Sequence, residues 1–169
     1  MDAKLEGIVS QLKNLLIGNS LSLAVAESCT GGLLSHVLTG ISGSSQFFMG
    51  GIIAYSNEVK IEVLGVQEQT ILLYGAVSHQ TAQEMAQNIR GKLHADIGLS
   101  TTGIAGPTGG SPTKPVGLVW LGISTAAGTE TFECHFTGGR DEVKQGAVKN
   151  ILKLLMERLN KDKDLSKAG

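Results

Sequence analysis

The segment from Leu21 to Leu38 most constrains the fold, because an apolar run, a polar turn and a second apolar run follow one another directly. Residues 21–26 predict a buried strand, and residues 33–38 predict the helix that follows it. The turn between them, residues 27–32, reads Glu-Ser-Cys-Thr-Gly-Gly. A strand that leads through a tight polar turn into a helix is typical of an α/β fold, where ligands bind at such strand ends.

The other apolar patterns continue this alternation of strands and helices. A short segment at 126–129 joins the last two strands, which predicts an antiparallel hairpin and therefore a mixed sheet. Asn57 and Ser78 are the predicted N-caps of the third and fourth helices. Helices are predicted over residues 5–16, 33–38, 58–64, 78–93 and 143–159, and strands over residues 21–26, 47–55, 96–102, 116–125 and 130–137.

These elements predict one three-layer α/β/α sandwich with a mixed, mainly parallel sheet. Residues 1–160 form the expected single domain, and residues 161–169 form a polar tail that we expect to be disordered. A chain of 169 residues can bury roughly two thirds of its unfolded surface without metals or disulfides.

Composition narrows the expected partners and location. A net charge of −1 and 17% charged residues leave no basic field for a nucleic-acid backbone, so we expect no direct nucleic-acid binding. No apolar run approaches the ~18 residues that a membrane span requires, and no membrane partner is expected. Cys29 and Cys134 match no metal or redox spacing, which favours reduced thiols in a cytoplasmic protein without a metal site.

Ser28 is the candidate nucleophile, but a serine hydroxyl needs a base to activate it. Lys60 is the better candidate base, because it follows the strand that ends at Tyr55 and adjacent strand ends would bring it near Ser28. Such a base would need its pKa lowered by ~3 units from ~10.4. The four histidines fall in predicted helices or strands outside the glycine-rich clusters, so a serine-histidine-acid triad has weak support: His36, His79, His94 and His135.

Each of these residues also has a structural interpretation. A lone serine at a strand-to-helix turn is more often a cap or an ST-turn, and a lone helical lysine is more often solvated. These alternatives apply to Ser28 and Lys60. Cys29 can simply pack, and Tyr55 can be a half-buried strand residue. Glu27 can orient Lys60, cap the helix or face solvent.

The glycine-proline loop at residues 103–115 is long enough to predict a functional loop. Its Gly106-Pro107-Thr108-Gly109-Gly110 segment matches neither the P-loop nor the dinucleotide fingerprint, which argues against ATP or NAD as ligands. Arg140, just before the last helix, either balances an anionic substrate or is a surface charge.

Six ordered sequence blocks, taken together, resemble the CinA C-terminal domain family over almost the whole chain. The match is to the stand-alone form; longer members carry an additional N-terminal domain. The blocks are Ala26-Glu27-Ser28-Cys29-Thr30-Gly31-Gly32, Gly43-Ser44-Ser45, Tyr55-Ser56-Asn57 with Lys60, Gly75-Ala76-Val77-Ser78, Gly103-Ile104-Ala105-Gly106-Pro107 with Gly109-Gly110, and Lys114-Pro115-Val116-Gly117.

The resemblance implies a nicotinamide mononucleotide amidohydrolase of the PncC type, which forms nicotinate mononucleotide and ammonia without a cofactor. It also implies that Ser28 and Lys60 act as a Ser-Lys pair, supported by Tyr55, and that the protein is a homodimer or higher homo-oligomer. The apolar first or last helix is a candidate interface. The family name refers to competence and DNA damage, which the near-neutral charge does not support as a direct activity.

In the expected mechanism Ser28 attacks the carboxamide, Lys60 takes its proton, and an amide from residues 29–32 stabilises the oxyanion. Two alternatives remain: a non-catalytic domain that binds a pyridine nucleotide or an ADP-ribose-like ligand, and an amidase for another small amide. The expected substrate-binding residues are Glu27, Cys29, Thr30, Gly31, Gly32, Ser45, Asn57, Thr102, Gly103, Gly106, Gly109, Gly110 and Arg140.

Overall fold

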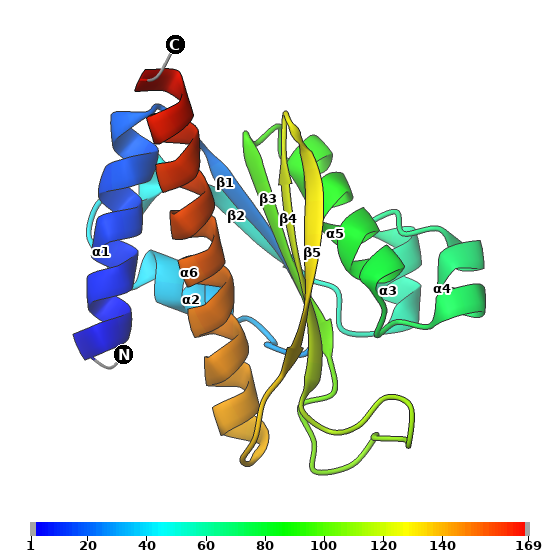
Figure 1. The fold of residues 1–169 in the computed structure, drawn as a ribbon. Helices are drawn as coiled ribbons and strands as arrows, with labels where there is room; N and C mark the ends of the chain where they lie inside the picture. The colour runs from blue at the N-terminus through cyan, green and yellow to red at the C-terminus, as the bar shows by residue number, and fades with distance from the viewer. Residues whose placement is uncertain (1–2, 168–169) are drawn as a thin grey trace.

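A five-stranded sheet lies between two layers of helices in the computed structural model, which describes residues 3–167 (Figure 1). The elements in chain order are α1 (Ala3–Gly18), β1 (Leu23–Glu27), α2 (Leu33–Thr39), the 3-10 turn η1 (Ser44–Gln46), β2 (Phe48–Ile53), α3 (Asn57–Glu62), α4 (Glu68–Tyr74), α5 (His79–Lys92), β3 (Ile97–Gly103), β4 (Leu118–Thr125), β5 (Gly128–His135) and α6 (Arg140–Lys167).

The sheet has the strand order β2-β1-β3-β4-β5. β1 pairs in parallel with β2 and β3, whereas β4 is antiparallel to both β3 and β5. Four strands therefore run in one direction and β4 runs against them. The predicted mixed, mainly parallel sheet and its terminal hairpin are confirmed, and β1 lies in the interior of the sheet, where all five of its residues are buried.

The two faces of the sheet carry side chains of different size. α1, α2 and α6 lie on one side of the sheet, and α5 packs against the other side, where α3 and α4 also lie (Figure 1). Leu23 and Val25 of β1 join the larger apolar core on the first face, while Ala24 and Ala26 join the smaller core on the second. Small residues on the second face allow α5 to approach closely: a Cβ on Gly98 would lie 2.2 Å from the Ala86 carbonyl oxygen.

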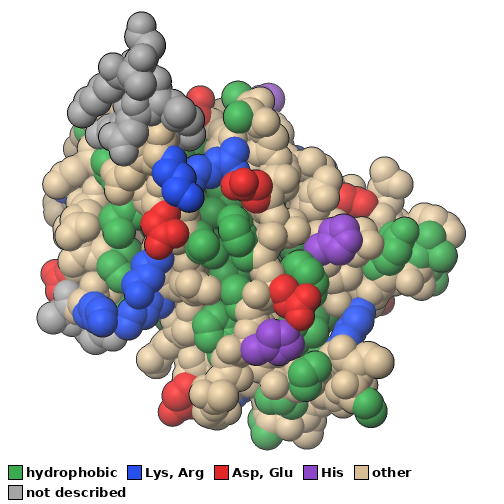
Figure 2. All heavy atoms as spheres, viewed as in Figure 1, with side chains coloured by type: hydrophobic (Ala, Val, Ile, Leu, Met, Phe, Trp, Pro, Cys, Tyr) green, Lys and Arg blue, Asp and Glu red, His purple; other side chains and the backbone are tan. Residues whose placement is uncertain are grey.

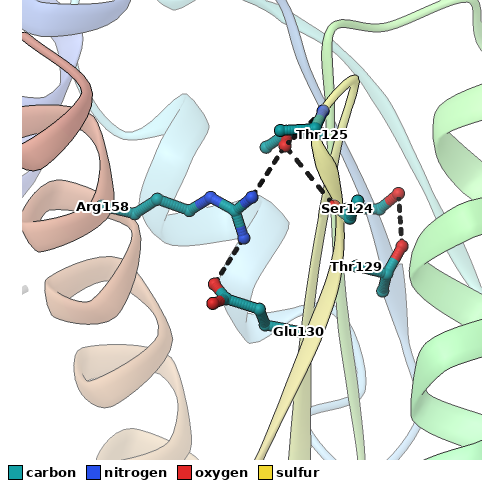
Figure 3. Close-up of polar contacts among 7 residues, drawn as sticks. Ser124, Thr125, Thr129, Glu130 and Arg158 are labelled. Carbon is teal, nitrogen blue, oxygen red and sulfur yellow. Dashed lines mark hydrogen bonds and ion pairs between the residues drawn. The ribbon is translucent and has the colours of Figure 1, made fainter. Parts of the chain in front are cut away.

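The α6 helix holds the turn of the terminal hairpin at the sheet edge opposite the carboxyl ends of β1 and β3. Arg158 donates one hydrogen bond to Glu130 and another, 2.9 Å long, to the Thr125 hydroxyl (Figure 3). Thr129 donates to the Ser124 hydroxyl at 3.0 Å. These contacts fix both ends of the hairpin turn.

Three details differ from the sequence-based expectations. Ser56, not Asn57, caps α3: its backbone is extended and its hydroxyl accepts from the Val59 amide. The short helix α4 was not predicted, because its Leu72 and Leu73 are exposed and give no buried stripe. α6 continues through Lys167, so residues 161–167 are helical, since adding residues to a formed helix is easier than starting one. Residues 168–169 lie outside the described part.

Within the described residues, no helix combines the length and the apolar character needed to cross a membrane.

Candidate active site

Polar side chains from three neighbouring strands meet at the carboxyl ends of those strands. Ser28 follows β1, Tyr55 and Lys60 follow β2, and Thr102 lies at the end of β3. Because β2, β1 and β3 are adjacent and parallel, their carboxyl ends share one edge of the sheet. A cavity of about 250 Å³ lies at this edge. Its lining includes Ser28, Cys29, Tyr55, Asn57, Lys60, Thr102, Gly103, Gly106, Gly109 and Arg140, all expected from the sequence.

Lys60 and Ser28 are in direct contact. The Lys60 Nζ lies 2.9 Å from the Ser28 Oγ, and it also donates to the backbone carbonyls of Ala54 at 2.9 Å and Tyr55 at 3.0 Å. Lys60 is 1% exposed although it lies on a short surface helix. α3 therefore places this amine beneath the cavity, and the two carbonyls hold it against the serine.

The surroundings of Lys60 favour its neutral form. Burial lowers the pKa of Lys60 from its ordinary value, because the protonated amine loses its hydration; Cys29 and Glu58 oppose this shift. A neutral amine still has two N–H groups for the two carbonyls, and its lone pair then faces the Ser28 hydroxyl. The arrangement is that of a nucleophile and its general base.

Cys29 is the other nucleophile type in the turn, but its thiol is held protonated. Burial raises the pKa of Cys29 to about 12. Because the thiolate is the reactive form of cysteine, this thiol is a poor nucleophile at neutral pH. Of these two residues, Ser28 is therefore the better candidate nucleophile, because it contacts a base directly.

The Glu27 carboxylate holds the turn that presents Ser28. Glu27 is fully buried and accepts five hydrogen bonds. One oxygen accepts from the Thr30 hydroxyl at 2.6 Å and from the amides of Gly32 and Leu34 at 3.0 Å; the other accepts from the Ser35 amide at 2.8 Å and its hydroxyl at 2.7 Å. The carboxylate also lies at the N-terminus of α2, where negative charge is favourable.

Four turn residues expected to contact substrate are absent from the cavity lining: Glu27, Thr30, Gly31 and Gly32. The Glu27 carboxylate is directed into the α2 N-terminus instead. The Thr30 hydroxyl donates to Glu27, so the Thr101 hydroxyl, 2.7 Å away, donates to Thr30. Gly31 and Gly32 have φ values of 58° and 96°, which shape the turn.

Removing the charge of Glu27 is expected to destabilise the fold. In Glu27→Gln the side-chain amide would face existing donors and leave some unsatisfied, so the free energy of unfolding should fall by about 3 kcal/mol. Urea unfolding measures this change. Glu62→Gln, at an exposed position of α3, is the control and should unfold like the parent chain. Equal stability of Glu27→Gln and the parent would contradict the assigned role.

Two amides of the nucleophile turn remain available to a ligand. The Gly31 amide donates to the Ser28 carbonyl, and the Gly32 amide donates to Glu27. Among residues 3–167, the amides of Cys29 and Thr30 donate to no other residue. The amide directly after a nucleophile is a common oxyanion donor, so Cys29 is the best placed of the four.

Arg140 also lines the cavity. Its guanidinium donates to the Gly106 carbonyl at 2.8 Å and to the Tyr55 hydroxyl at 2.7 Å. Tyr55 therefore contributes its carbonyl to Lys60 and its hydroxyl to Arg140. The Thr102 hydroxyl donates to the Ala76 carbonyl at 2.7 Å and fixes the neighbouring loop. Among residues 3–167, three of the five Arg140 N–H groups donate to no other residue and remain for an anion.

Ser45 and Gly110 do not line the cavity in this chain. Ser45 lies in η1, which precedes β2, so it is at the amino ends of the parallel strands and on the opposite edge of the sheet. Gly110 packs against Val116, where a Cβ would lie 2.8 Å from the backbone nitrogen.

Five lining residues were not named individually in advance, although the sequence contained a signal for them. They come from the Gly75–Ser78 block and from the glycine-proline loop. They are Ala76, Val77, Ile104, Ala105 and Thr108. None of the four histidines lines this cavity, and His79 instead packs against Trp120 with ring centroids 5.7 Å apart.

The family model of the CinA C-terminal domain matches residues 5–159. The chain belongs to this family. A CinA-like protein of Cyanothece sp. is 47% identical over 156 residues, which cover 91% of this chain and 37% of the relative. A CinA-like protein of Acidobacterium capsulatum is 52% identical over 138 residues, covering 82% of this chain and 33% of the relative. The CinA domain thus spans about a third of these curated relatives.

Solved CinA structures share the whole fold. The competence/damage inducible protein CihA from Agrobacterium tumefaciens superposes with a TM-score of 0.91 at 37% identity, covering 95% of this chain and 98% of that one. A CinA superfamily protein from Escherichia coli gives a TM-score of 0.88 at 32% identity, with 92% of each chain covered. These similarities agree with the α/β fold described above.

Proposed function

We propose that this CinA domain is an amidohydrolase that converts nicotinamide mononucleotide and water into nicotinate mononucleotide and ammonia. The observation that carries the proposal is the 2.9 Å contact between the Lys60 Nζ and the Ser28 Oγ inside a cavity at the strand ends. The sequence resemblance supplies the substrate, and the geometry supports an amide as the bond that is broken.

The first half of the reaction forms an ester on the serine. The Ser28 Oγ attacks the carboxamide carbon while neutral Lys60 accepts the hydroxyl proton. The Cys29 amide, with the Thr30 amide nearby, donates to the developing oxyanion; such a donor contributes about 2.7–4 kcal/mol. The C–N bond then breaks, and protonated Lys60 returns the proton to the leaving nitrogen, which departs as ammonia.

The second half releases the acid. Neutral Lys60 takes a proton from water, and the resulting hydroxide equivalent attacks the acyl carbon. The ester C–O bond breaks and the proton passes from Lys60 to the Ser28 oxygen. Nicotinate mononucleotide leaves and the original pair is restored.

Arg140 and the glycine-proline loop are the proposed site for the 5′-phosphate. Within the described part of the chain, Arg140 has three N–H groups without an acceptor, which suits it to a bidentate contact with phosphate. Thr108 and Gly109 line the same cavity, and their amides donate to no other described residue. Backbone amides of such a loop can hold a phosphate without a metal.

The proposal is tested by measuring ammonia released from nicotinamide mononucleotide and from free nicotinamide. We expect turnover of the nucleotide and a much lower kcat for nicotinamide, because contacts to the ribose phosphate contribute to the rate itself. Saturable binding of the nucleotide without ammonia would indicate a binding domain. Equal kcat values would indicate an amidase for a different small amide.

A further inference from the structure

The glycine-proline loop carries one charged side chain, and that side chain is the one turned inward. Lys114 is the only charged residue among residues 103–117. Hydrophobic side chains gather at the lower right of Figure 2, where Figure 1 places this loop. From Pro107 to Val116 every residue is exposed except Lys114, which is partly buried. Lysine is ordinarily among the most exposed residues, so this reversed pattern points to a specific contact.

The Lys114 ammonium bonds to the end of a neighbouring helix. Its Nζ donates to the Tyr74 carbonyl at 2.7 Å, and Tyr74 is the last residue of α4. The last carbonyls of a helix lack partners within the helix, and a lysine is a favourable donor to them. Gly75 leaves the necessary space, because a Cβ there would lie 2.9 Å from the Lys114 Nζ. The sequence blocks at residues 75–78 and 114–117 therefore meet in one contact.

The loop packs on itself around Val116. A Cβ on Gly106 would lie 2.5 Å from the Val116 Cγ1, and a Cβ on Gly110 would lie 2.8 Å from the Val116 backbone nitrogen. The Ser111 amide also donates to the Lys114 carbonyl at 2.8 Å. Because this internal packing is close, an anchor at one point of the loop constrains the rest of it.

Two side-chain hydrogen bonds anchor residues 105–116 to other parts of the described chain. Arg140 donates from α6 to the Gly106 carbonyl, and Lys114 donates from the loop to Tyr74. Arg140 is also the residue proposed to bind phosphate, whereas Lys114 and Tyr74 lie outside the cavity lining. The Lys114 bond therefore serves the loop alone.

The Lys114 contact joins two segments that line the cavity. Ala76 and Val77, which follow α4, are lining residues, and so are Thr108 and Gly109 of the loop. A bond from the loop to the end of α4 therefore fixes one pair of lining residues relative to the other.

We propose that Lys114 is a positioning residue, which holds the Thr108 and Gly109 amides where the substrate phosphate meets them. The role in phosphate placement rests on the proposed function, and the anchoring of the loop does not. Lys114 does not line the cavity, so it acts through the loop. Because ordered donors bind an anion more tightly than mobile ones, the anchor contributes to the preference for a phosphorylated substrate.

Hydrogen exchange of the ligand-free protein tests the anchor. In Lys114→Met, peptides that cover residues 105–117 should exchange at least about threefold faster than in the parent, because the loop opens more often. Methionine has a side chain of similar length but cannot donate to Tyr74. Lys92→Met, at the exposed end of α5, removes the same charge and should exchange like the parent. Unchanged exchange in Lys114→Met would overturn the proposal, whatever ligand the cavity takes.

Calorimetry tests the role in phosphate placement, with Ser28→Ala as the background so that no substrate is consumed. Adding Lys114→Met should raise the dissociation constant of nicotinamide mononucleotide at least about tenfold, because the phosphate donors lose their fixed positions. Nicotinamide riboside, which lacks only the phosphate, should bind with a constant changed less than about twofold. Lys92→Met is again the control and should change neither constant.

The difference between the two ligands identifies positioning, since a damaged fold would weaken both alike. Equal weakening of nucleotide and riboside, or unweakened nucleotide binding, would overturn the role of Lys114 in phosphate placement. Absence of nucleotide binding in the Ser28→Ala background alone would instead count against the proposed function. The exchange measurement then still decides whether Lys114 anchors the loop.

Discussion

Replacing Ser28 with alanine is expected to lower ammonia release from nicotinamide mononucleotide by at least about 10³-fold. The change removes the atom that forms the ester and leaves the rest of the cavity in place. Ser28 makes no side-chain hydrogen bond in the described chain other than the one from Lys60, so the fold should be retained. Nucleotide binding, measured by calorimetry, should also persist. Loss of turnover with retained binding identifies a chemical role for the hydroxyl.

Two further variants make this result specific. Ser10→Ala, at an exposed position of α1, is the matched control and should turn over nucleotide like the parent. Cys29→Ala tests the other candidate nucleophile, which its raised pKa argues against. Undiminished turnover in Ser28→Ala would disprove the nucleophile assignment. Loss of turnover in Cys29→Ala alone would transfer that role to the thiol.

The parts of the site that could be predicted from sequence are those fixed by neighbouring strand ends. Ser28 directly follows β1, and Lys60 lies in α3, which follows β2. The parallel pairing of β1 and β2 brings the two residues together. This inference needs only the element order and the sense of the sheet. The burial of Lys60 could not be predicted in the same way, because it depends on where α3 packs.

The direction of a side chain was much harder to predict than its position. Glu27 lies next to Ser28 in sequence, yet its carboxylate points into the α2 N-terminus and not into the cavity. Three amides and two hydroxyls determine that direction, and they are arranged only when the turn has formed. Both residues flank Ser28 in the sequence, yet Cys29 lines the cavity and Glu27 does not.

Ser45 shows that the edge of the sheet that a residue reaches was also hard to predict. A sequence block can belong to a site without any local pattern that says which edge of the sheet it reaches. The path through η1 into β2 puts Ser45 at the amino edge, whereas the cavity lies at the carboxyl edge. Within one copy, Ser45 and the cavity therefore lie at opposite edges of the sheet.

Replacing Lys60 with methionine is expected to lower turnover by about 10²–10⁴-fold, the usual contribution of a general base. Methionine fills most of the buried space but cannot accept the Ser28 proton. Lys60→Arg is the sharper comparison, because it keeps N–H donors for the two carbonyls but stays protonated at every accessible pH. Both variants should show this loss of turnover. A Lys60→Arg variant that retains most of its turnover would show that the lysine acts only through its contacts to Ala54 and Tyr55.

The pH dependence follows from the lowered pKa of Lys60, which burial causes. Only the neutral amine is a base, so turnover by the parent should rise with pH through that lowered pKa, while residual turnover in Lys60→Met should lack this rise. In the unfolded chain Lys60 keeps its proton up to its ordinary pKa of about 10.4. Between the two pKa values the unfolded state therefore binds more protons, and the Lys60 contribution to the free energy of unfolding increases with pH. Urea unfolding from neutral to alkaline pH should show this increase in the parent more than in Lys60→Met. A parent turnover that is flat or falling over the same range would contradict a neutral lysine base, because protonated Lys60 can donate to Ser28 but cannot take its proton.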